Sequence, residues 1–266
     1  MRKIRREPCM VIAVINNKGG TGKTTTSVSL SAALADRGYQ VLLADLDAQA
    51  SASLSLGVQW NDLKPSVADV LLGDADIAGI IRMSQIPNLS LMTADMELVN
   101  ADLGLANVPG RENRLSECLE TIRHAYDFIL LDCPPSLSLI SVNALLAADG
   151  HIVPVTPEYL ALEGLISLMD AVEKLEKGME KSVNLLGIVF TMTQPTLNIT
   201  RKIIAIVREH YGEKVFQTEI KRDVRLSEAP SFSQSVFDLD PKSQGAKAYA
   251  MLTNELIRHL NMEPRP

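Results

Sequence analysis

Cysteine is scarce in this sequence, which has only Cys9, Cys118 and Cys133. Their number is odd and no two of them form a CxxC pair, so we expect neither a disulfide framework nor a zinc site. The sequence also lacks any apolar run near the ~18 residues that span a bilayer. The apolar stretch behind the N-terminus stops at Ile15 and has the wrong shape for a signal peptide. We therefore expect a cytoplasmic protein.

No linker, repeat or low-complexity tract divides the 266 residues, which suffice for one large α/β domain. We divide the chain into a short basic arm at 1–10, a single α/β domain at 11–260 and a polar tail at 261–266. The basic residues of the arm are Arg2, Lys3, Arg5 and Arg6. Contact with DNA, contact with a partner and disorder are all compatible with this composition.

The net charge of −6 does not suggest a general nucleic-acid binder, so any such binding must depend on a local patch. Between positions 196 and 225 the local charge is +3. The basic residues there are Arg201, Lys202, Arg208, Lys214, Lys221, Arg222 and Arg225. A solvated helix surface is the other interpretation of such a cluster.

Apolar runs alternate with amphipathic stretches along the chain. The runs lie at 11–15, 41–44, 89–92, 128–131, 150–155 and 185–190, and a final helix is expected at 245–260. Continuous apolar strands separated by helices predict a mostly parallel, twisted sheet with helices on both faces and right-handed crossovers. Ligands of such sheets bind beyond the carboxyl ends of the strands.

A glycine-rich loop follows the first of these strands and precedes a predicted helix at 27–36 that Gly38 closes. Strand, glycine loop and helix are the context of a phosphate-binding loop, in which backbone N–H groups surround phosphate oxygens. In this pattern Lys23 reaches the β- and γ-phosphates and the Thr24 hydroxyl holds Mg²⁺. The predicted ATP-binding residues are Lys18, Gly19, Gly20, Thr21, Gly22, Lys23, Thr24 and Thr25.

The loop departs from the general pattern G-x-x-x-x-G-K-[ST], because Asn17 stands where glycine is expected and Lys18 follows it. A lysine so early is poorly placed for its own γ-phosphate, but it could serve a nucleotide on a second subunit. The segment resembles the deviant Walker A loop of the ParA/MinD class of ATPases. In that class two subunits enclose two ATP molecules, so the resemblance implies an ATP-dependent homodimer with Lys18 acting across the interface.

Two carboxylates, Asp45 and Asp47, follow the second apolar run. Their i, i+2 spacing predicts that they face the phosphate site together, and turn or cap carboxylates are the alternative interpretation. The segment resembles the family's D-x-D-P-Q, in which the second aspartate positions the attacking water. That implies a catalytic role for Asp47, while Asp45 could order the water shell of Mg²⁺. Ala48 replaces the family's proline, and we expect the chemistry to survive this.

Asp132 closes another apolar run, which is the Walker B arrangement that contacts Mg²⁺ through water. The string at 132–136, D-C-P-P-S, resembles ParA/Soj-type partition proteins, and Cys133 is interpreted as a small packing residue. Three further segments, at 158–165, 224–231 and 240–246, resemble motifs of the same family. The resemblance covers nearly the whole chain.

The resemblance implies a P-loop NTPase fold and a weak ATPase that works as a switch. Its ATP-bound dimer would bind nonspecific double-stranded DNA on the nucleoid, and a ParB-like partner would stimulate hydrolysis. The cargo could be a chromosome origin, a plasmid or a protein assembly. No membrane contact is expected.

The implied DNA contacts are Arg225, Arg222, Lys221, Arg201 and Lys202. Arg225 matches the arginine of the family's V-R-L-S-E-A-P motif. The family usually has I-P-R-N where this chain has 220–223, so Asp223 adds an acid, and Thr196 stands where relatives have an arginine. Arg201 and Lys202 are possible substitutes.

Two other functions remain open on the same scaffold. A MinD-like membrane switch would need an amphipathic terminal helix, whereas 249–260 favours a packed one. A metabolic enzyme is the second, such as a nitrogenase-type iron protein or a cobyrinate-type ligase. An iron–sulfur bridge would have to use Cys118 or Cys133.

Overall fold

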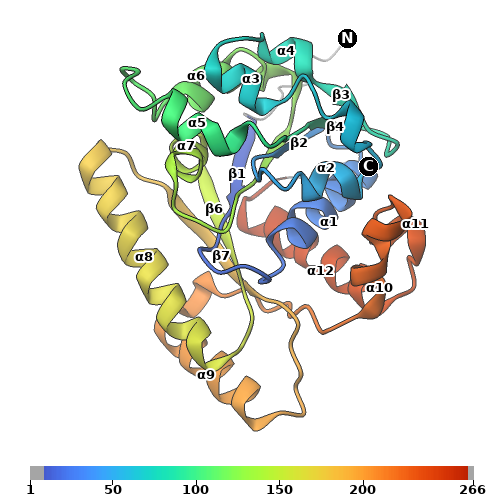
Figure 1. Ribbon diagram of the computed structural model, residues 1–266. Helices are drawn as coiled ribbons and strands as arrows, with labels where there is room; N and C mark the ends of the chain where they lie inside the picture. The colour runs from blue at the N-terminus through green and yellow to red at the C-terminus, as the bar shows by residue number, and fades with distance from the viewer. Residues whose placement is uncertain (1–8, 263–266) are drawn as a thin grey trace, which may run out of the picture.

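A seven-stranded sheet lies between two layers of helices (Figure 1) in the computed structural model, which describes residues 9–262. Its strands are β1 Met10–Val14, β2 Val41–Asp45, β3 Arg82–Met83, β4 Leu89–Met92, β5 Phe128–Asp132, β6 Gly150–Val155 and β7 Asn184–Phe190. The strand order is β3-β4-β2-β5-β1-β6-β7, and only the β3–β4 pair is antiparallel. The arm residues 1–8 and the tail residues 263–266 lie outside the described residues.

All six apolar runs are strands, which confirms the predicted parallel sheet. The strand β3 was not predicted, because two residues cannot show a periodic pattern. It pairs through Arg82 and Met83 with β4 at one edge of the sheet.

The helices are α1 Lys23–Asp36, α2 Ser51–Ser55, α3 Val67–Leu72, α4 Ile77–Ile80, α5 Leu98–Gly104, α6 Arg114–Glu120, α7 Leu139–Ala147, α8 Tyr159–Met179, α9 Asn198–Tyr211, α10 Val224–Glu228, α11 Val236–Leu239 and α12 Gln244–His259. None of them, within the described part of the chain, is long and apolar enough to cross a bilayer. The helix predicted at 27–36 begins four residues earlier, at Lys23, directly after Gly22 in a left-handed conformation.

Strand β1 faces both helical layers. Val11 and Ala13 belong to a core shared with α3 and α5 to α9, whereas Ile12 belongs to a core shared with α1 and α12. All three side chains have no exposed surface. Alternation of side chains along a strand therefore accounts for the continuous apolar run, since both faces are covered.

The terminal helix α12 is packed against α1, as predicted. Leu252 and Leu256 are fully buried, and the hydroxyls of Thr26 and Tyr249 share a hydrogen bond of 3.0 Å between the two helices. The Arg37 guanidinium after α1 also donates to the Ala250 carbonyl, at 3.0 Å.

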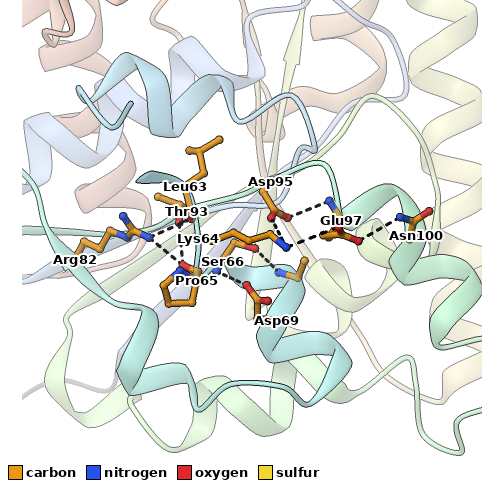
Figure 2. Close-up of polar contacts among 11 residues, drawn as sticks. Leu63, Lys64, Pro65, Ser66, Asp69, Arg82, Thr93, Asp95, Glu97 and Asn100 are labelled. Carbon is orange, nitrogen blue, oxygen red and sulfur yellow. Dashed lines mark hydrogen bonds and ion pairs between the residues drawn. The ribbon is translucent and has the colours of Figure 1, made fainter. Parts of the chain in front are cut away.

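The turn between α2 and α3 is held by two groups from the sheet, as Figure 2 shows. The Arg82 guanidinium donates to the carbonyls of Leu63 and Pro65, both at 3.1 Å. The Thr93 hydroxyl donates to the Leu63 carbonyl at 2.6 Å. Lys64 lies 3.6 Å from an Asp95 carboxylate oxygen beyond the end of β4. These contacts fix the chain beside the carboxyl edge of the sheet.

Candidate nucleotide-binding site

The glycine loop begins where β1 ends, and its path is fixed by hydrogen bonds to neighbouring strands. The Asn16 amide group donates to the Pro154 carbonyl at 2.7 Å, and its oxygen accepts the Lys18 backbone N–H at 3.0 Å. The Thr191 hydroxyl donates to the Thr21 carbonyl at 2.8 Å. Gly22 has φ +83°, a conformation that glycine adopts without strain.

Lys23 opens α1 and turns its side chain back over the loop. It is buried, and its Nζ donates to the Lys18 carbonyl at 3.1 Å. Burial lowers the pKa of Lys23, and the carboxylates of Asp132 and Asp47 oppose that effect. A cation at the mouth of a loop of N–H groups is suited to phosphate oxygens.

Asp132 ends β5 beneath the start of α1. Its Oδ1 accepts the Ser27 hydroxyl at 2.8 Å, whereas its buried Oδ2 has no hydrogen-bond partner among residues 9–262. Burial and the nearby Asp45 raise the pKa of Asp132 to about 7, and Thr24 and Ser27 lower it.

The hydroxyl of Thr24 and the unpartnered oxygen of Asp132 fit Mg²⁺, which prefers oxygen ligands and keeps several waters. No group of three His, Cys, Asp or Glu side chains in the described chain could hold a metal by itself. Magnesium at this site would therefore depend on water and nucleotide oxygens as well as on the protein.

The two aspartates after β2 have different surroundings. Asp45 is fully buried, and its Oδ2 accepts both the backbone N–H and the hydroxyl of Ser53, at 2.8 and 2.7 Å. Burial raises its pKa to about 6. Asp47 is only partly buried, accepts the Gln49 backbone N–H at 3.0 Å and acts electrostatically on Lys23. Of the two, Asp47 has the freer carboxylate beside the loop.

Lys18 points away from Lys23 and forms an ion pair with Glu158. Its Nζ lies 2.8 Å from the Glu158 carboxylate, and the two side chains are 39% and 66% exposed. Glu158 directly precedes α8. Glu158 opens the segment at 158–165 that resembles a family motif, but it was not predicted as a site residue, and the chain path at the carboxyl edge of the sheet brings it to the loop.

A hollow of about 130 Å³ adjoins the loop at Gly22 and Thr25. Ile220 and Leu226 give it apolar surfaces, and Asp223 gives it a polar edge. Such a mixture suits a flat heteroaromatic group. This pocket was not predicted from the sequence, because its residues come from four separate segments of the chain.

The five predicted DNA-contact residues lie on two elements and a connecting segment. Arg201 and Lys202 are exposed on α9. Lys221, which forms an isolated β-bridge with Thr193, and Arg222 are also exposed, and Arg225 lies on α10. Arg225 forms ion pairs with Glu228 at 2.8 Å and Asp240 at 3.5 Å. The Arg222 guanidinium has no hydrogen-bond or ion-pair partner among the described residues.

Asp223 has a structural role. Its Oδ1 accepts the backbone N–H of Arg225 at 2.9 Å, and its Oδ2 accepts that of Gly245 at 2.6 Å. It caps α10 and joins that helix to the first turn of α12.

The three cysteines are free thiols. Cys133 is buried, and burial raises its pKa above the usual range, as the packing interpretation predicts. Burial also raises the pKa of Cys118, and that of Cys9 to about 11. Cysteines activated as nucleophiles need the opposite shift.

The AAA domain family matches residues 9–185 of this chain. The chain is 42% identical over 246 residues to the sporulation initiation inhibitor protein Soj of Bacillus subtilis, covering 92% of this chain and 97% of Soj. It is 39% identical over 252 residues to the chromosome partitioning protein ParA of Caulobacter vibrioides, covering 94% of each.

A solved structure supports the assigned fold. The fold is similar to cobyrinic acid a,c-diamide synthase from Mycobacterium smegmatis, solved with a bound ATP analogue and magnesium. The TM-score is 0.84 and the identity 32%, and the alignment covers 97% of this chain and 98% of the other.

Proposed function

Because this chain belongs to the ParA/Soj family of P-loop ATPases, we propose that it is an ATP-driven switch that partitions or positions a cargo. The observation that carries the proposal is that two lysines of one loop point in different directions. Lys23 is buried and faces the loop, whereas Lys18 is held outward by Glu158. An outward lysine can serve a nucleotide held by a second subunit.

ATP would bind with its phosphates on the loop and its base in the hollow beside Thr25. Thr24 and Asp132 would hold Mg²⁺, which supplies positive charge to the phosphate oxygens when bound. Asp47 would orient the attacking water, and Asp45 supports this loop through its bonds to Ser53. Weak basal hydrolysis suits a switch whose output is its nucleotide state.

The ATP-bound dimer would bind nonspecific double-stranded DNA through Lys221 and Arg222, with Arg201, Lys202 and Arg225 adding to the same surface. Dimerisation doubles the number of phosphate contacts. Affinity should therefore fall steeply with salt.

A ParB-like partner on the cargo would stimulate hydrolysis and release, in the cytoplasm and on the nucleoid. The packing of α12 on α1 supports this assignment over a MinD-like membrane switch, because the apolar side of that helix is already buried. The sequence identity of the chain is also higher to Soj and ParA, at 42% and 39%, than to the diamide synthase, at 32%.

The test is binding to nonspecific duplex DNA with ATP, with ADP and without nucleotide, at low and moderate salt. The Asp47→Ala variant should hold the ATP state. We expect binding only with ATP, and we expect salt to weaken it. Absence of binding in every state would refute the DNA-tethered switch.

A further inference from the structure

A second hollow, of about 350 Å³, lies between the beginnings of α8 and α9. These two helices lie side by side next to the β7 edge of the sheet (Figure 1). Large apolar side chains line the hollow and remain exposed, namely Tyr159, Met192, Leu197 and Ile199. Tyr159 is 73% exposed. Clustered exposed apolar groups in a concave surface are typical of a contact site.

A buried polar group also lines this hollow. Thr156 directly follows β6 and is 5% exposed, and its hydroxyl has no hydrogen-bond partner within the described chain. Buried hydroxyls are normally hydrogen-bonded, so Thr156, whose oxygen has almost no accessible surface, is an unsatisfied polar group next to the hollow.

The charges around the hollow favour an anionic occupant. Its one carboxylate, Glu158, is already paired with Lys18 at 2.8 Å. Its one guanidinium, Arg222, is unpaired within residues 9–262. The cation is thus available to a ligand, whereas the anion is largely neutralised.

We infer that this hollow binds a short acidic segment of a partner protein. A carboxylate of the segment would pair with Arg222, and its apolar side chains would pack against Tyr159, Leu197 and Ile199. The volume accommodates a few side chains and not a DNA duplex.

This inference rests on the proposed function in one respect, because Arg222 is also a proposed DNA contact. A carboxylate and a phosphate at the same guanidinium repel each other, because both are negatively charged. Partner binding would therefore compete with DNA. Arg222 and Met192 also line the pocket beside Gly22, so the occupant would adjoin the nucleotide site.

The test selects random twelve-residue peptides on phage against the full-length protein. Enriched sequences should contain Asp or Glu between apolar residues. The affinity of a synthetic peptide with that sequence should fall at least tenfold in Arg222→Ala and in Ile199→Glu. The matched controls are Arg225→Ala, whose guanidinium is already ion-paired, and Ile206→Glu, an exposed position further along α9. Both should bind the peptide within about twofold of the wild type.

Enrichment of basic peptides would make Glu158 the anchor and overturn the inference, as would the absence of any enrichment. Equal affinity in Arg222→Ala would also overturn it. The same peptide should displace duplex DNA from the wild type with ATP. If DNA binds and the peptide binds without displacing it, the competition is refuted. If DNA never binds, the proposed function fails, and the peptide result still decides the inference.

Discussion

Lys18 and Glu158 are 140 positions apart in the chain, yet their side chains meet at 2.8 Å beside the nucleotide site. Both are partly exposed, so the pair contributes little to stability. The ion pair instead orients the Lys18 side chain, which it holds away from the Lys23 side of the loop.

The first prediction concerns this pair. Lys18→Ala should still bind ATP but lose ATP-dependent dimerisation and hydrolysis, since Lys23 remains in place. Glu158→Gln should weaken dimerisation severalfold, because Lys18 loses its orientation. Analytical ultracentrifugation with ATP measures both. Glu163→Gln, an exposed carboxylate in the first turns of α8, is the control. Normal dimerisation of Lys18→Ala would refute the role across the interface.

The second prediction ranks two arginines. Arg222→Ala should reduce DNA affinity more than Arg225→Ala, because Glu228 and Asp240 already neutralise Arg225. For each cation removed from a DNA phosphate, the slope of log affinity against log salt should become shallower by about 0.9. Titrations of labelled duplex at several salt concentrations give both the affinities and the slopes. A larger reduction of affinity in Arg225→Ala would mean that DNA opens its two ion pairs.

The third prediction concerns Asp223, whose removal should have two opposing effects. Loss of an acid beside the basic surface favours DNA binding, whereas loss of a helix cap and of the bond to Gly245 disturbs that surface. We expect the structural effect to prevail in Asp223→Ala, with a loss of about 1–2 kcal/mol in the free energy of unfolding and weaker DNA binding. A drop in melting temperature of about 2–6 °C would accompany it.

Asp223→Asn removes the charge and keeps the helix cap, because its amide oxygen still accepts the Arg225 N–H, whereas its NH₂ group cannot accept the Gly245 N–H. It should bind DNA at least as well as the wild type. Tighter binding by Asp223→Ala, with unchanged stability, would contradict the capping role.

The fourth prediction is a pH dependence. His151 on β6 is buried, and burial lowers its pKa to about 4. The unfolded chain takes up a proton near pH 6.5, whereas the folded chain does not until near pH 4. The free energy of unfolding should therefore fall as pH drops through this window, by up to about 3 kcal/mol from this group.

Urea denaturation at pH 7, 6 and 5 measures the slope. His151→Leu should flatten it, whereas His210→Leu, at an exposed position on α9, should leave it unchanged. Equal slopes in the wild type and His151→Leu would show that other groups set the acid response.

The main sheet was predictable because its strands are buried on both faces and appear as continuous apolar runs. Lys23, Thr24 and Asp132 could be predicted as site residues because a loop pattern and a strand end mark them locally. The two-residue strand β3 offers no such pattern. The sequence could not predict which charged side chains pair, because pairing depends on how the folded chain arranges its segments. This holds for the Lys18–Glu158 contact, for the ion pairs of Arg225 and for the unpaired Arg222. Asp223 shows most clearly what the sequence could not predict. Its charge suggested a weaker DNA-binding surface, whereas in the fold its carboxylate accepts hydrogen bonds from two backbone N–H groups.

Strand β1, covered on both sides, ends a few residues before Gly19 and Gly20, which are exposed. Amide hydrogens of the strand should exchange only on global unfolding, while those of the loop exchange freely without nucleotide. The boundary between the slowest and the fastest protons of the molecule would then fall within one short segment. Nucleotide binding can then reorganise the loop while the central strand stays still.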